Sequence, residues 1–216
     1  MRLIWESLPE VARGLGVTLL MWLPGSLVAL AAGLVLAVLR FWGGPVLDGA
    51  LRAVLGVVRG TPFLVQIFLL YYGGPFVGLE LDAPEAGLLG LGVYGAAYFA
   101  EILRGGLAAV PAGHVEAAAA VGMTRGQALR RVLLPEMALL VLPSSVNMLV
   151  VLMKETATLS IITVPELTAV ITGIGSLHFA YAEAACMLAV CYWGLTEATG
   201  LVGRGLERRL DRFRIA

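Results

Sequence analysis

The chain has 216 residues, of which 59% are hydrophobic and only 14% are charged, and its formal net charge is zero. So apolar a composition predicts a single membrane-embedded domain over residues 1–216, because a soluble core does not need this many apolar side chains. The zero net charge gives no indication of nucleic-acid binding, and two cysteines five apart in one apolar run, Cys186 and Cys191, predict neither a disulfide nor a metal site.

Five stretches are long and apolar enough to cross a hydrocarbon core about 30 Å thick, which takes roughly 20 helical residues. The expected spans are residues 15–39, 62–79, 86–103, 137–153 and 179–203. The predicted fold class is therefore an all-α integral membrane protein with about five transmembrane helices. We interpret the first stretch as a retained span and not as a cleaved signal peptide.

Basic residues gather after the odd-numbered spans. They are Arg40, Arg52 and Arg59, then Arg104, Arg125, Arg130 and Arg131, and finally Arg204, Arg208, Arg209, Arg212 and Arg214. Because short cytoplasmic loops are enriched in Lys and Arg, the pattern predicts an N-terminus outside and a cytoplasmic C-terminus. The loop after the second span agrees, since it carries Glu80, Asp82 and Glu85 without a basic residue, whereas Arg2 and Arg13 disagree.

The tetrapeptide RGTP, residues 59–62, is typical of the start of a helix. Thr61 is suited to cap the second span, and Pro62 to occupy its first turn, where a missing N–H costs nothing. Two interpretations of Arg59 stay open. Either it fixes the cytoplasmic end of this span, or it contacts another protein.

The third span contains GLGVYG at residues 90–95, which matches the GxGxxG pattern of dinucleotide-binding loops. No strand precedes these glycines and they lie inside a long apolar run, so we interpret them as positions of close helix packing. Glu101 and Arg104, three residues apart near the end of the span, are expected to pair on one helix face.

A polar segment at residues 104–135 separates the third and fourth spans and includes HVEAAAAVGMTRGQALRRVLLPE. Its alanines predict a short helix, which Gly122 would end in a left-handed turn. Thr124 and Gln127 fit a capping box that would start a second short helix over Arg125–Leu134.

These two helices have the form of a docking element. An alanine surface lets another protein approach closely, and Glu116 supplies one anionic hydrogen-bonding group. An ordinary solvated connector between two spans would also fit this composition.

Lys154 and Glu155 follow about 17 mainly apolar residues of the fourth span, roughly 25 Å of helix. Charges inside a membrane are costly and face protein or water. In one interpretation the two side chains reach the interface as an ion pair. In the other they line a solute pathway with Asn147, Thr156 and Thr158, since a zwitterionic solute needs both a cationic and an anionic partner.

The outer and final parts of the chain carry fewer signals. Residues 163–178 are expected to form a short helix at the outer face. Glu183 and Glu197 lie in the fifth span without an assigned role. His114 and His178 are isolated, so neither indicates a catalytic or metal site.

Several motifs together resemble one family. Glu116-Ala117-Ala118, then Gly122 and later Leu134-Pro135, resemble the EAA motif of the membrane subunits of ATP-binding-cassette importers, with Val132 where that family usually has isoleucine. The polar amino-acid branch of the family is similar over VVRGTPFLVQIFLLYYG, YFAEILRGGLAAVPAGHVEAAAAVGM, LMKETATLSIITVPELT and LERRL. The similarity covers most of residues 10–210.

The resemblance implies a type I importer permease in the bacterial inner membrane, which forms the pathway for a polar amino acid delivered by a solute-binding protein. The segment at 104–135 would contain the coupling helix, which docks on a cytoplasmic ATPase. The implied coupling residues are Glu116, Ala117, Ala118, Gly122, Pro135 and Arg59. A second permease subunit, identical or related, is a further implied partner. The chain itself would be no enzyme and would bind no cofactor, with ATP and Mg in the ATPase.

Two departures from the usual family pattern bear on the solute. Glu136 follows the Leu-Pro pair, and Lys154-Glu155-Thr156-Ala157 replaces a lysine-aspartate-threonine-serine pattern. An importer of a related small solute therefore stays open as a hypothesis. An ATP-independent secondary transporter or channel is another hypothesis, although the five spans offer no internal repeat for it. A membrane scaffold or signalling subunit is the last one.

Overall fold

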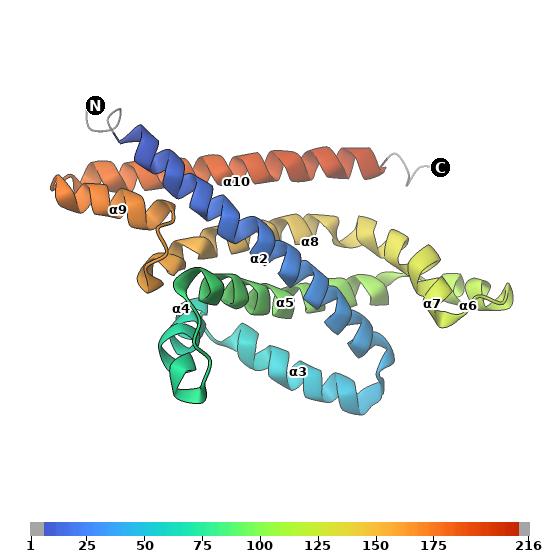
Figure 1. The fold of residues 1–216 in the computed structure, drawn as a ribbon. Helices are drawn as coiled ribbons and strands as arrows, with labels where there is room; N and C mark the ends of the chain where they lie inside the picture. Colours follow the sequence, from blue (N-terminus) through green and yellow to red (C-terminus); the bar gives the residue numbers. More distant parts are fainter. Residues whose placement is uncertain (1–6, 212–216) are drawn as a thin grey trace.

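The computed structural model describes residues 7–211, so Arg2, Arg212 and Arg214 lie outside the described part. Every regular element in that part is a helix, which confirms the predicted all-α class (Figure 1). Four helices are long and apolar enough to cross a membrane, and a fifth span results if one bent pair of helices is counted.

Two long helices, α2 (Leu8–Trp42) and α5 (Ala83–Ala109), pack against each other at the centre of the molecule (Figure 1). Their backbones approach closely, because a Cβ on Gly95 would lie 2.6 Å from the Cβ of Ala29. Helices in lipid associate through such small residues, since lipid tails are as apolar as the side chains they would replace. The predicted packing role of the glycines at residues 90–95 is confirmed.

The second expected span, residues 62–79, is broken into short pieces. It contains α4 (Phe63–Phe68), the π-helix η1 (Leu69–Gly73) and the 3₁₀-helix η2 (Gly74–Val77). The preceding helix α3 (Gly44–Gly60) meets this segment at an angle of 98°. No straight second span therefore exists in the described residues, and α3 adds a helix that the sequence patterns did not predict.

The bend originates in the two residues between α3 and α4. Thr61 and Pro62 have extended backbone, with ψ 138° and 140°, because a residue that precedes proline is pushed away from the helical region. The predicted cap at Thr61 is wrong, since Pro62 is the N-cap of α4 and no side chain caps this helix. Thr61 Oγ1 instead donates to the carbonyl of Val57 (3.1 Å), and Gln66 Nε2 donates to that of Val58 (2.6 Å).

The fourth span begins earlier than expected. The helix that starts at Arg125 does not end at Leu134 but continues through α7, η3, α8 and η4 as one candidate span, Arg125–Ile162. The predicted separate short helix is therefore wrong. Its end was expected at the Leu-Pro pair, but the π-helix η3 ends at Leu133 and Pro135 lies in the first turn of α8, where a residue without an N–H is tolerated. The pieces are α7 (Arg125–Ala128), η3 (Leu129–Leu133), α8 (Leu134–Glu155) and η4 (Thr156–Ile162).

The remaining helices mark the two ends of the molecule. In Figure 1, α6 (Ala112–Ala120) and α7 lie at the end opposite α9 (Leu167–Leu177). The described chain starts near α9, and α10 (Tyr181–Asp211) runs from there toward the end that holds α6. The core between the ends is apolar, and its largest fully buried side chains include Phe99, Ile67, Leu91, Leu107, Leu133 and Leu152.

Candidate functional site

A helical hairpin projects from one end of the molecule. Its first arm is α6, and a turn at Gly122 (φ 77°) reverses the chain. The amide of Gly122 donates to the carbonyl of Ala119, and the amide of Met123 donates to that of Ala118, both at 3.0 Å. These are the two bonds of a Schellman motif, for which glycine is the preferred left-handed residue. The predicted glycine stop of α6 is confirmed.

The second arm starts with the capping box that the sequence predicts. Gln127 N donates to Thr124 Oγ1 (3.3 Å), and Thr124 N donates to Gln127 Oε1 (2.9 Å). Two otherwise orphaned backbone amides are thereby satisfied at the start of α7. The connection between the arms is consequently a fixed turn.

The hairpin presents a small-residue surface to the solvent. Glu116, Ala117 and Pro135 are exposed, and so is Gly122 at the tip. Ala118 differs from these residues because it is buried, with 4% of its surface exposed, and so faces the second arm.

One side-chain contact joins the hairpin arms at the end opposite Gly122. His114 Nδ1 lies 2.8 Å from the carboxylate oxygens of Glu136, across 22 residues of sequence. This pair was missed from the sequence, in which His114 stands isolated. The pair could have been predicted from the expected hairpin, because antiparallel arms bring a residue near the start of α6 to the first turn of α8.

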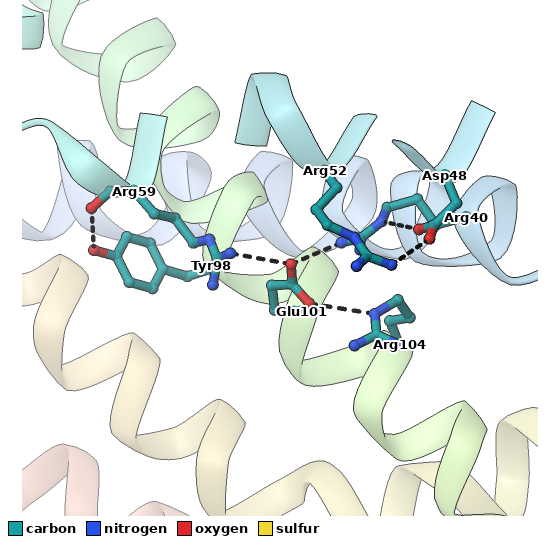
Figure 2. A network of polar contacts seen from close by, with 7 residues as sticks. All are labelled: Arg40, Asp48, Arg52, Arg59, Tyr98, Glu101 and Arg104. Atoms are coloured by element: carbon teal, nitrogen blue, oxygen red, sulfur yellow. Dashed lines mark hydrogen bonds and ion pairs between the residues drawn. The ribbon is translucent and has the colours of Figure 1, made fainter. Parts of the chain in front are cut away.

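A network of charges joins three helices at a second place (Figure 2). Glu101 on α5 accepts from Arg40 Nη1 on α2 (2.8 Å), from Arg59 Nη2 on α3 (3.1 Å) and from Arg104 Nε (3.3 Å). The predicted Glu101–Arg104 pair is confirmed, but it is the longest of the three contacts. The two shorter contacts link α5 to neighbouring helices.

Arg40 anchors the network because its side chain is only 1% exposed. Its Nε also donates to Asp48 Oδ1 (2.8 Å), and Asp48 Oδ2 accepts from Arg52 Nη2 (2.6 Å). From α3, Asp48 therefore points toward α2 and Arg59 points toward α5 (Figure 2). Charges within a membrane are expected to pair inside the protein in this way. For Arg59, the contact with Glu101 favours the structural interpretation.

A hollow of about 580 Å³ lies between α5 and α8, and its lining combines polar side chains with the apolar residues Ile102, Pro143, Met148 and Val151. Tyr94 and Tyr98 contribute hydroxyls from α5, and Ser144 and Asn147 contribute a hydroxyl and an amide from α8. Tyr98 also donates weakly to the carbonyl of Arg59 at 3.4 Å. Both tyrosines were missed from the sequence, although their spacing of four residues puts them on one face of α5.

The remaining expected pathway residues lie outside this hollow. Lys154 is exposed and forms no ion pair with Glu155, as far as the described residues extend. Glu155 accepts weakly from Thr158 Oγ1 (3.5 Å), and the buried Thr156 donates to the carbonyl of Met153 (2.6 Å). The interpretation of Lys154 and Glu155 as a mutual ion pair is therefore wrong.

At the opposite end of the molecule, Glu166 is a fully buried carboxylate that was not singled out from the sequence. It lies in the loop before α9 and accepts from the amides of Thr168 and Ala169, both at 2.8 Å. Tyr192 on α10 donates to it at 3.0 Å. Glu166 thus caps α9 and ties it to α10.

The fifth-span carboxylate at Glu197 faces Arg204, with 3.6 Å between the charged atoms. Both residues line a second hollow of about 310 Å³ between α8 and α10, and Asn147 lines it too. Asn147 therefore lies between the two polar hollows. Cys186 and Cys191 are free thiols.

Comparisons with known proteins agree on one class. The model of the family described as "binding-protein-dependent transport system inner membrane component" matches residues 29–212. The probable amino-acid ABC transporter permease protein YckA of Bacillus subtilis (strain 168) is 33% identical, over 98% of this chain and 94% of its own length. The glutamine transport system permease protein GlnP of Escherichia coli (strain K12) is 32% identical, over 96% of this chain and 95% of its own.

Two solved structures are similar in fold. A crystal structure of an amino acid ABC transporter with histidines has a TM-score of 0.86 and 32% identity, over 95% of this chain and 96% of that chain. An inward-facing conformation of the MetNI methionine ABC transporter has a TM-score of 0.80 over 95% of this chain and 98% of that chain. Its identity is 21%, so this second likeness concerns the fold alone.

Proposed function

This chain belongs to the family of binding-protein-dependent transport system inner membrane components, and from that premise we propose that it forms the path of a polar amino acid through a bacterial inner membrane. It is the membrane-spanning permease subunit of an importer. The observation that carries the proposal is the hairpin built on α6, whose second arm continues into α8. Force applied to the hairpin thereby reaches a helix that lines a polar hollow.

The hairpin is the proposed docking site for a cytoplasmic ATPase, which would hold the ATP and Mg²⁺. Glu116 and Ala117 are exposed on α6, where they would supply a hydrogen-bonding anion and a small surface for close approach. Gly122 and Pro135 would act by shaping the turn and the second arm. The proposed role of Ala118 is packing within the hairpin, because it is buried. Arg59 would support the site from inside the protein.

The hollow between α5 and α8 is the proposed cargo site. Its hydroxyl and amide groups, from Tyr94, Tyr98, Ser144 and Asn147, can donate to a carboxylate and accept from an ammonium group. Among the described residues, no charged side chain lines this hollow, so neutral hydrogen-bonding groups would bind the solute there in place of the charged partners expected from the sequence. Lys154, Glu155, Thr156 and Thr158 would form a second part of the solute pathway, separate from this hollow and nearer the outer face.

The proposed orientation and partners follow from the same two sites. The α6 end would face the cytoplasm, so that the N-terminus lies outside and the C-terminus inside. A solute-binding protein would deliver the cargo at the α9 end. A second permease subunit, identical or related, would cover α10, whose most apolar window has none of its residues buried.

The test is reconstitution in proteoliposomes with the ATPase and the solute-binding protein. Glu116→Ala and Gly122→Ala are expected to lower import at least about tenfold, since one removes the docking anion and the other strains a left-handed turn. Binding of the ATPase is measured in parallel by co-purification. Glu80→Ala, an exposed glutamate in the loop before α5, is the matched control. Unchanged ATPase binding and import in both hairpin variants would contradict the proposal.

A further inference from the structure

The α6 hairpin is closed at both ends. At its tip, the Schellman bonds at Gly122 and the capping box at Thr124 fix the turn. At its base, His114 Nδ1 lies 2.8 Å from the carboxylate of Glu136. Between the two ends, the burial of Ala118 packs α6 against the second arm. Together these contacts favour movement of the hairpin as one body.

The two connections of the hairpin to the membrane helices differ. Its second arm belongs to one candidate span, Arg125–Ile162, which is interrupted by no bend above 40°. Its first arm is joined to α5 through Val110 and Pro111, which both have extended backbone with ψ 128° and 134°. Two extended residues break the helical hydrogen-bond ladder, so α6 is not a continuous extension of α5, and this non-helical link is the hinge that the inference below requires.

The chemistry of the His114–Glu136 contact is defined by its acceptor. A carboxylate only accepts, so the Nδ1 atom of His114 must carry the proton. The contact is a neutral hydrogen bond when the ring has one proton and an ion pair when it has two. Charge-assisted hydrogen bonds are the stronger of the two.

We propose that His114 and Glu136 are positioning residues, which lock the α6 hairpin to the base of α8 so that a displacement of α6 moves α8 while α5 stays behind at its hinge. The inference rests on the proposed function, because it assigns the route by which force from a docked ATPase enters the membrane. Without the contact, the base of α6 would separate from α8 and part of its displacement would be lost.

The test compares imported solute per ATP hydrolysed in the reconstituted importer. His114→Ala and Glu136→Ala are each expected to lower this ratio about two- to fivefold, which is the change in an equilibrium constant that the loss of an exposed charged pair produces. The double alanine variant should be no worse than either single variant, since both remove one contact. Exchanging the partners, His114→Glu with Glu136→His, should restore the ratio. Single variants with an unchanged ratio, or an exchange variant as poor as the singles, would overturn the proposal.

Hydrogen exchange of the α6 amides separates the inference from the proposed function. In the purified permease alone, residues 112–120 should exchange faster in His114→Ala than in the wild type or the exchange variant. Equal exchange would refute the lock itself. A wild-type chain that shows the lock but neither binds nor drives an ATPase would instead refute the proposed function and, with it, the route of force.

Discussion

At the scale of single residues, Asn147 has the most informative position. Asn147 lines both the hollow between α5 and α8 and the hollow between α8 and α10. Among the lining residues, Pro143, one turn earlier on α8, is the other that both hollows share. An amide has two donors and one acceptor oxygen, so it can bind a carboxylate or an ammonium group without a charge of its own. A solute in either hollow can therefore contact this side chain.

Asn147→Ala is expected to raise the KM for import about tenfold, because a hydrogen bond to a charged group contributes about 1.5–3 kcal/mol. Basal ATP hydrolysis should stay unchanged, since the hairpin is untouched. Ser145→Ala is the matched control, because Ser145 lies on the same helix and lines neither hollow. Initial uptake rates over a range of solute concentrations measure the effect. An unchanged KM would show that the cargo does not bind Asn147. The double variant Lys154→Met with Glu155→Gln would then test the second part of the proposed pathway, nearer the outer face.

At the scale of helices, local signals could be read from the sequence and long-range contacts could not. The α6 turn was predicted because Gly122, Thr124 and Gln127 act on neighbouring backbone groups. The bend between α3 and α4 was missed, since Thr61-Pro62 also fits the first turn of a straight span. Two of the three partners of Glu101, Arg40 and Arg59, were missed for a different reason. Arg40 lies 61 residues away, and no helical periodicity relates the two.

Glu101 holds three helices together, so Glu101→Gln is expected to destabilise the protein by about 3 kcal/mol. The variant keeps the shape of the side chain but leaves Arg40, which is 1% exposed, with less compensation for its charge. Thermal unfolding in detergent, followed by tryptophan fluorescence, measures the loss. Arg52→Gln is the control within the same network. Its side chain is 66% exposed, so its removal should cost less than about 1 kcal/mol. Equal effects of the two variants would contradict a central role of Glu101.

At the scale of the whole molecule, the polar features divide between the two ends. The α6 hairpin and the basic residues Arg125, Arg130 and Arg131 lie at one end, whereas the Glu166 cap of α9 lies at the opposite one (Figure 1). Apolar helices connect the ends, with the polar hollow between α5 and α8. The arrangement suits alternating access, in which a movement at one end changes the exposure of a central site.

This division makes the orientation testable. In a chain with Cys186→Ser and Cys191→Ser, a cysteine placed at Glu116 should react with a membrane-impermeant maleimide only from the cytoplasmic side. A cysteine at Glu80 should react only from the outside, since Glu80 lies in the exposed loop before α5. Intact cells and inside-out vesicles provide the two sides. Arg13 disagrees with the charge pattern, so a reversed result is a meaningful outcome: labelling of the Glu116 position in intact cells would put the hairpin outside, beyond the reach of any cytoplasmic ATPase.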